Sequence, residues 1–186
     1  MARIDEVDRK IISLLTTNPK MSQSEISEFL GISQPAVGAR IRKLRDEGII
    51  THLVGVNLKK SGLFLVKVEI ETRESQGILD FFKECPLYAN GLVTSGKRNL
   101  CLFLLGENMR SIVACIDKHI RGNPDIIDIE LDFVITPTKD IVLPLTMEKE
   151  KKHITPCGEK CLECSYYTLD RCLGCPRTVA YKGTLL

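Results

Sequence analysis

Tryptophan is absent from this chain, histidine occurs three times, and aromatic residues make up only 5% of its 186 positions. Without indole rings, stacking of tryptophan on nucleic-acid bases is excluded. Long apolar runs are missing too, since none approaches the roughly 20 residues that a membrane-spanning helix needs. The first residues, MARIDEVDRK, also lack the apolar core of a signal peptide. We therefore expect a cytoplasmic protein with no membrane partner.

A strong excess of one charge is also missing, because 26 lysines and arginines are balanced by 24 aspartates and glutamates. This balance excludes a polycation that coats nucleic acid and leaves room only for local basic patches. The eight cysteines are unevenly distributed. Cys85, Cys101 and Cys115 each stand alone in apolar surroundings, as reduced core thiols do, whereas the other five crowd into the last thirty residues.

The stretch from Ser22 to Glu47 predicts two helices joined by a tight turn. Ser22 is followed three residues later by Glu25, which is the capping-box arrangement at a helix start. Gly31 can adopt the left-handed conformation that ends this helix, and Ser33 can cap the next one. This order is typical of a helix-turn-helix, whose second helix enters the major groove of DNA.

The second of these helices has an apolar side and a polar, basic side. Val37, Ile41 and Leu44 recur at positions i, i+4 and i+7, so we expect them to face inward. Small outward residues would let the helix approach the base edges, and long basic ones would reach phosphates. The candidate DNA-binding residues are Ser33, Gln34, Pro35, Gly38, Ala39, Arg40, Arg42 and Lys43. A basic run alone is more often a solvated face, but caps, turn and apolar spacing agree here, so we favour DNA binding.

A preceding helix is expected from Asp5, as its cap, to about Thr17. It would pack behind the helix pair, whose first member presents Ile26, Phe29 and Leu30 as an apolar face. Together the three helices predict a small DNA-binding domain with a three-helix core.

Beyond this domain the pattern changes. Residues 49–56 are rich in strand-forming residues and suit either a short wing hairpin or a strand that leads out of the domain. We expect three parts: a winged helix-turn-helix over residues 1–60, a second domain over residues 61–147 and a cysteine-rich tail over residues 148–186.

The second domain is predicted to contain a strand, a helix, two strands, a helix and a strand. Apolar and charged residues alternate in the segments expected to be strands, and Gly96-Lys97-Arg98 is a plausible hairpin turn between the middle two. The order is that of a ferredoxin-like βαββαβ domain (ACT/RAM-like), so the fold class is α+β. Its open sheet face and edges need a partner, and we expect sheet-mediated dimers.

From Ile4 to about Pro144 the chain resembles the Lrp/AsnC family of transcription regulators. The resemblance is carried by IDEVDRKIISLL, by LGISQPAVGARIRKLRDEGII and by the ferredoxin-like domain that begins near Leu63. It implies a transcription regulator, not an enzyme, that binds a partly palindromic operator in double-stranded DNA as a homodimer or a higher multiple of dimers. Two-fold symmetry would present paired recognition helices to that operator.

Members of this family often bind an amino acid near the loop between the second and third strands. Here the corresponding candidate effector residues are Ser95, Gly96, Lys97, Arg98 and Asn99. The loop has no acidic residue where the family commonly shows one, so an anionic effector is an alternative for Lys97 and Arg98. Two basic residues at a hairpin tip more often serve solubility.

A branch that resembles the same family consists of siroheme decarboxylases, so an enzyme on this architecture is the alternative function. Those proteins are rich in histidine and arginine around the third strand. Here that strand contains Asn99-Leu100-Cys101-Leu102-Phe103, without histidine, and we favour the regulator.

The tail contains the motif PCGEKCLECSYYTLDRCLGCP, with the spacing C-x3-C-x2-C-x7-C-x2-C. Two C-x2-C pairs so close together predict a metal site, because each pair can direct two sulfurs at one ion. Disulfides are disfavoured in a reducing cytoplasm. The candidate ligands are Cys157, Cys161, Cys164, Cys172 and Cys175.

The identity of the metal stays open between zinc and a [4Fe-4S] cluster. Zinc would use four of the five thiols, most simply the four nearest the C-terminus, with His153 as a possible substitute. A cluster also takes four cysteines, and Cys175-Pro176 resembles the end of ferredoxin ligand runs. The fifth cysteine, Cys157, favours a redox- or metal-responsive site, since a structural zinc site has no need of it. We therefore expect a regulator modulated by the tail.

Overall fold

The computed structural model describes residues 4–145 and 150–184. The chain divides into two compact units, Met1–Leu53 and Val54–Leu186, which we describe separately. The domain boundaries expected between residues 60 and 61 and between residues 147 and 148 are not tested by this division and stay predictions. The second of them falls in residues 146–149, which lie outside the described part.

The first unit contains three helices, α1 (Glu6–Thr17), α2 (Gln23–Leu30) and α3 (Gln34–Asp46). Each begins at the predicted cap, and the Ser22 hydroxyl accepts a hydrogen bond from the Glu25 backbone N–H at 3.2 Å. Gly31 has a φ of 65° and ends α2 in the left-handed conformation. The local sequence thus determines where the helices start and stop.

The core of this unit is formed by one apolar side of each helix, and its buried residues are Ile11, Ile26, Val37, Ile41 and Leu44. The inward side of α3 is therefore as predicted. The prediction for Phe29 was wrong: its side chain is 71% exposed, because Ile26 and Leu30 already fill the side of α2 that faces the core.

The segment after α3 forms no strand within residues 49–55. The first strand is β1 (Val56–Asn57), which pairs antiparallel with β6 (Val142–Leu143) inside the second unit. Residues 49–55 thus form neither the wing hairpin nor the outgoing strand that were expected, and of the predicted range only Val56 lies in a strand. A short helix, α4 (Leu58–Ser61), follows β1 and was not anticipated.

Gly55 is required where this segment passes β6. A Cβ atom there would lie 2.3 Å from the backbone carbonyl oxygen of Leu143. We expect Gly55→Ala to destabilise the β1–β6 pair by about 1–2 kcal/mol, with faster hydrogen exchange of the Leu58 amide, which donates to the Ile141 carbonyl at 2.9 Å. Gly96→Ala is the matched control, since its Cβ would meet only the Arg98 carbonyl oxygen at 3.8 Å. Equal exchange at Leu58 in both variants would contradict the steric argument.

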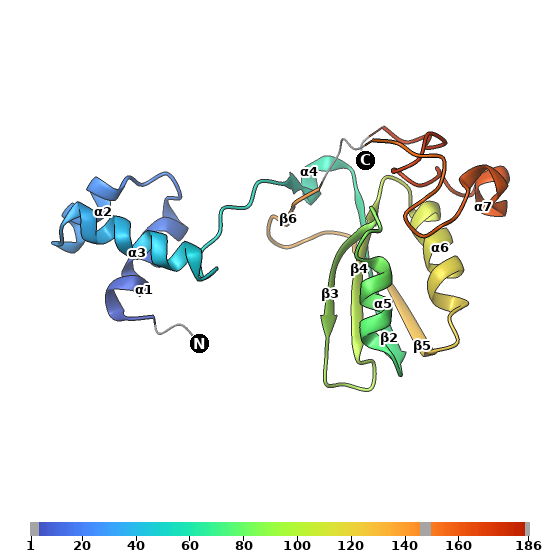
Figure 1. Cartoon of the computed structure of the whole chain (residues 1–186), viewed down its shortest axis with the longest axis horizontal. Helices are drawn as coiled ribbons and strands as arrows, with labels where there is room; N and C mark the ends of the chain where they lie inside the picture. The colour runs from blue at the N-terminus through green and yellow to red at the C-terminus, as the bar shows by residue number, and fades with distance from the viewer. Residues whose placement is uncertain (1–3, 146–149, 185–186) are drawn as a thin grey trace. The chain divides into compact units, whose positions relative to one another are not determined.

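The second unit is built on a four-stranded antiparallel sheet with the order β3-β4-β2-β5 (Figure 1). Its strands are β2 (Phe64–Thr72), β3 (Tyr88–Val93), β4 (Leu100–Gly106) and β5 (Ile126–Phe133). With a helix between β2 and β3 and another between β4 and β5, this is the predicted ferredoxin-like βαββαβ arrangement. The antiparallel β3–β4 pair confirms the hairpin predicted at residues 96–98.

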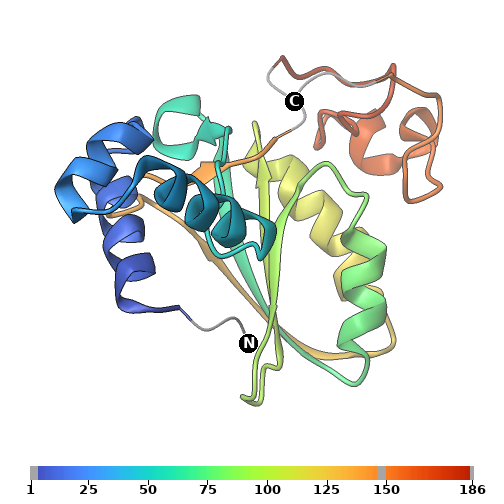
Figure 2. The same ribbon diagram turned by 60° about the vertical axis from the view of Figure 1, so that its left-hand side comes forward.

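Helices α5 (Ser75–Phe82) and α6 (Met109–Ile116) cover one face of the sheet (Figure 2). The core between helices and sheet consists of Val66, Val68, Ile70, Ile78, Phe82, Leu100, Leu102, Leu104, Ile112, Ile116 and Ile120. The opposite face of the sheet carries charged side chains. The alternation of apolar and charged residues along β2 and β5 therefore sorts the two faces.

The helix predicted from Met109 to Ile120 changes character at its end. After α6 the chain continues as one π-helical turn, η1 (Asp117–Arg121). Such turns are rare, and they occur frequently at functional sites. Periodicity does not reveal this change.

The tail over residues 150–184 contains only a 3-10 turn, η2 (Cys161–Glu163), and a short helix, α7 (Ser165–Thr168). It lies beside α6 (Figures 1 and 2). The Ser111 hydroxyl accepts a hydrogen bond from the Leu173 N–H at 2.9 Å, which ties the tail to that helix. Within the described residues, no helix is both long and apolar enough to span a bilayer.

Candidate nucleic-acid interface and thiol site

The outer surface of α3 presents the residues that the sequence placed there. Gln34, Pro35, Ala39, Arg42 and Lys43 are all exposed. Ser33 is exposed as well, and its hydroxyl accepts a hydrogen bond from the Ala36 N–H at 3.4 Å, so it acts as the helix cap. The surface combines amide, small and basic side chains, which are the groups that contact base edges and phosphates.

Gly38 does not belong to this outer surface, contrary to the prediction. It is buried, and a Cβ atom there would lie 2.7 Å from the Oε1 atom of Gln23 on α2. The absence of a side chain at Gly38 therefore lets α2 approach α3. Its small size serves packing inside the domain rather than close approach to a base.

Arg40 is also engaged inside the domain. Its Nη1 atom lies 2.6 Å from Oδ2 of Asp5 and 2.7 Å from Oδ1 of Asp8, both at the start of α1. The Asp8 side chain is only 2% exposed, and Arg40 is the cation that compensates its carboxylate in this buried position. The backbone N–H of Asp8, followed by Arg40, lowers the pKa of the Asp5 carboxyl. This geometry assigns Arg40 to the α1–α3 contact and leaves Arg42 and Lys43 as the outward cations among the predicted DNA-binding residues.

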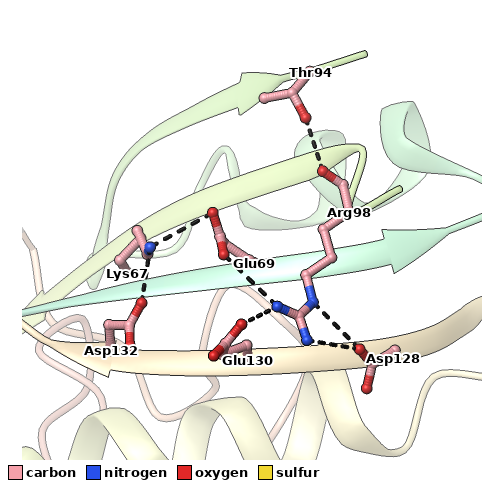
Figure 3. Close-up of polar contacts among 7 residues, drawn as sticks. All are labelled: Lys67, Glu69, Thr94, Arg98, Asp128, Glu130 and Asp132. Carbon is pink, nitrogen blue, oxygen red and sulfur yellow. Dashed lines mark hydrogen bonds and ion pairs between the residues drawn. The ribbon is translucent and has the colours of Figure 1, made fainter. Parts of the chain in front are cut away.

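The predicted effector loop is neutralised by its own sheet. Arg98 contacts Asp128 at 3.0 Å and forms an ion pair with Glu130, both on β5 (Figure 3). The Arg98 guanidinium lowers the pKa of the Asp128 carboxyl. Lys97 lies 3.3 Å from Glu71. The acidic partners missing from the loop sequence thus come from neighbouring strands.

The other loop residues hold the hairpin in place. The Asn99 side chain accepts from the Thr72 N–H at 3.0 Å and donates to the Thr72 carbonyl at 2.9 Å. Ser95 and Gly96 are exposed at the tip. Within the described residues, both loop cations therefore have carboxylate partners, which compete with an anionic effector at this loop.

The tail cysteines lie at one cavity of about 90 Å³ between the tail and the helices of the second unit. The C-x2-C segment that ends at Cys175 is folded as a knuckle: the Gly174 N–H donates to Cys172 Sγ at 3.4 Å, and Gly174 has a φ of 88°. The Cys175 N–H donates to Cys161 Sγ at 3.3 Å. Amide donors directed at sulfur favour the thiolate that a metal requires.

Burial acts in the opposite direction on these thiols. Burial raises the pKa of Cys172, and it raises the pKa of Cys175 to about 12. Without a metal both groups are therefore neutral at physiological pH, and metal binding must displace their protons.

The donor set fits a thiophilic metal or a cluster, because several thiols with amide hydrogen bonds share one cavity. In the part of the chain that the structure describes, no three His, Cys, Asp or Glu side chains already stand at metal-ligand spacing. Binding would therefore draw the sulfurs together. His153 is not among the residues that line the cavity.

Two cysteines that the sequence placed alone in the core in fact line this same cavity. Cys85 follows α5 and Cys115 belongs to α6, and both lie with the tail thiols. His119 of η1 lines the cavity too. Only Cys101 stands apart, on β4. Spacing along the chain cannot reveal this set, because its members meet only when the tail packs on α6.

Taken together, a three-helix unit with an exposed basic recognition helix and a ferredoxin-like sheet define a two-domain helix-turn-helix protein. A family model described as "Winged helix-turn-helix DNA-binding" matches residues 4–51. An uncharacterized HTH-type transcriptional regulator from Pyrococcus abyssi is 29% identical over 67% of this chain and 83% of its own. The regulator LrpA from Bacillus subtilis is 28% identical over 67% of this chain and 97% of its own.

Solved structures agree on the fold. The structure of E. coli AsnC matches with a TM-score of 0.64 at 18% identity, over 74% of this chain and 96% of that one. The chain is a helix-turn-helix transcription regulator that is similar to regulators named LrpA in sequence and to AsnC in fold. The names of these relatives favour a regulator over the decarboxylase alternative.

Proposed function

We propose that this regulator binds a partly palindromic operator in double-stranded DNA and that a metal centre in its tail modulates the binding. The observation that carries the first part is the outward surface of α3, with Gln34, Arg42 and Lys43 exposed on a capped, well-packed helix. The basic pair supplies phosphate contacts, and the amide of Gln34 supplies a donor and an acceptor for a base edge.

A symmetric dimer would present two such helices to two half-sites. The open face of the sheet supports this assembly, because it carries cations and carboxylates that can also pair across an interface. On this face Lys67 lies 2.8 Å from Asp132 (Figure 3). In a homodimer or a multiple of dimers formed through the sheet, the interface belongs to the second unit and does not use the residues of α3.

The tail cysteines Cys157, Cys161, Cys164, Cys172 and Cys175 would hold either a zinc ion or a [4Fe-4S] cluster. When bound, zinc supplies a rigid tetrahedral crosslink, and a cluster adds a reversible change of charge. The tail contacts α6 and η1 through side chains, so its order is linked to the domain that carries the dimer interface. Metal binding can then change the DNA affinity by favouring one arrangement of the dimer.

An amino-acid effector is not part of this proposal. One structural neighbour, at 19% identity and a TM-score of 0.61, is a transcriptional regulator from Neisseria meningitidis in complex with L-Met. In the present chain Arg98 and Lys97 are already paired with carboxylates from β5 and β2. We therefore assign the modulation of DNA binding to the metal centre in the tail.

The test begins with protein purified without oxygen, its metal and sulfide content, and an operator selected from random DNA. We expect removal of the metal to change operator affinity by about 5- to 150-fold, the range of typical coupling between two sites. Binding is measured at matched salt concentrations, because phosphate contacts make affinity salt-dependent. Equal affinity of the two forms would overturn modulation by the tail, and failure to select any operator would overturn sequence-specific binding.

A further inference from the structure

The cavity between tail and domain contains more soft ligands than one metal centre needs. Seven cysteines and one histidine line it: Cys85, Cys115, Cys157, Cys161, Cys164, Cys172, Cys175 and His119. A tetrahedral zinc site uses four such ligands, and so does a cubane cluster. The tail alone can supply one complete set, from its two C-x2-C pairs, and this leaves four donors over.

The four remaining donors are near one another. Cys157 Sγ lies 3.6 Å from His119 Nε2. The thiols of Cys85 and Cys115 line the same cavity as Cys157 and His119. The cysteine that one tail site leaves unused is therefore the one whose sulfur contacts the imidazole of the domain.

The backbone of the domain is adapted to this contact. Three consecutive side chains of the π-helical turn η1 reach the tail. Asp117 accepts from the Tyr166 hydroxyl at 3.4 Å, Lys118 lies 2.8 Å from Glu159, and His119 contacts Cys157. Three neighbouring residues of one π-helical turn thus contact the tail, and such turns occur frequently at functional sites. This brings the imidazole into the thiol cavity.

We propose that Cys85, Cys115, Cys157 and His119 form a second site for a thiophilic divalent cation, with Zn²⁺ as the best fit. Three thiolates and one imidazole nitrogen are a recurrent tetrahedral zinc set. This site deepens the proposed function, and it rests on the tail's metal centre only for the position of Cys157. Zinc at this site would crosslink the tail to α6 and to the chain after α5. Metal binding would then act on the helices that pack on the sheet.

Charge balance is consistent with two adjacent centres. Zinc at the second site replaces three thiol protons, which leave to solvent, so that site carries a net charge of about −1; a four-thiolate zinc site carries about −2. Lys118 offsets part of this charge, since its Nζ atom lies 3.8 Å from Cys164 Sγ. Since no three ligands stand at metal spacing among the described residues, the exposed loop that carries Cys157 is the part expected to move.

The test is anaerobic zinc titration of the metal-free full chain, with Co²⁺ as a spectroscopic probe. The wild type should bind two equivalents of zinc. Cys85→Ala/Cys115→Ala and Cys161→Ala/Cys172→Ala should each bind one. Cys101→Ala is the matched control and should bind two, because Cys101 is buried on β4 outside the cavity. His119→Ala should shift the Co²⁺ ligand-field bands of one site only. This measurement does not require that the fold tolerate the substitutions of Cys85 and Cys115.

Each outcome separates the two proposals. One equivalent in the wild type, unchanged in Cys85→Ala/Cys115→Ala but lost in Cys161→Ala/Cys172→Ala, would overturn the second site and leave the tail centre intact. One equivalent with the opposite pattern would support the second site and overturn zinc at the tail centre, which would then have to be an iron–sulfur cluster in the iron and sulfide analysis or fail. A wild type that binds no zinc would overturn the second site, and the tail centre would then depend on the iron and sulfide analysis described above.

Discussion

Replacing both Arg42 and Lys43 by alanine is expected to lower operator affinity roughly 10- to 100-fold. Both side chains are exposed on the outward surface of α3, and neither forms an ion pair with a carboxylate within residues 4–145 and 150–184. A hydrogen bond to a charged group contributes about 1.5–3 kcal/mol, and part of this is recovered by hydration of the free phosphate. The loss should be similar for operator and random DNA, because phosphate contacts carry no sequence information.

The salt dependence of binding gives the sharper measurement. Each lost phosphate contact lowers the slope of log K against log salt by about one. The double variant should therefore lower it by about two per recognition helix, and by about four for a dimer that contacts two half-sites. Fluorescence anisotropy of labelled operator at several salt concentrations measures both quantities.

Arg9→Ala/Lys10→Ala is the control for net charge, because it removes the same two charges from an exposed side of α1. An equal loss of affinity in this variant would mean that general charge, and not α3, determines binding. An unchanged slope in Arg42→Ala/Lys43→Ala would place the phosphate contacts elsewhere.

The sequence was sufficient to predict elements that depend on near neighbours in the chain. The caps Asp5, Ser22 and Ser33 act within three residues, so the start of each helix follows from a short motif. The alternation along β2 and β5 likewise predicts which sheet face is apolar, because side chains alternate along any strand. For this reason the order of elements in both units could be predicted.

Features that depend on distant partners could not be predicted in this way. Gly38 and Arg40 are explained by Gln23 and by Asp8, which belong to other helices. The spacing of apolar residues along a helix shows only that a position lies away from the apolar side of that helix. It does not show whether a neighbouring helix covers that position, and this is why Gly38 was misplaced.

The candidate metal site shows the same limit on a larger scale. Its C-x2-C spacing is local and visible, whereas the thiols of Cys85 and Cys115 reach the cavity only because the tail folds back on α6. The π-turn that directs His119 to the tail has no periodic signature. Spacing along the chain thus predicted the tail ligands and could not predict their neighbours.

Replacing Arg40 by alanine is expected to destabilise the first unit by about 3 kcal/mol. Asp8 is nearly fully buried, and loss of its partner leaves a carboxylate without a compensating cation. Breaking a buried ion pair from one side costs about 3–5 kcal/mol, and the lower end applies because the Arg40 side chain remains 33% exposed. Arg42→Ala should not change stability measurably, since its side chain is exposed. The two neighbouring arginines therefore separate a structural role from a DNA-binding role.

Urea unfolding followed by far-UV circular dichroism measures this effect. The chain has no tryptophan, and its four tyrosines all lie after Leu53, so intrinsic fluorescence reports only the second unit. Asp8→Asn combined with Arg40→Ala should recover much of the lost stability, because asparagine removes the buried charge and keeps an oxygen that can accept from the Asp5 N–H, as Asp8 does at 3.2 Å. If Arg40→Ala unfolds at the wild-type urea concentration yet loses operator affinity, Arg40 contacts DNA directly and the assignment to the α1–α3 contact fails.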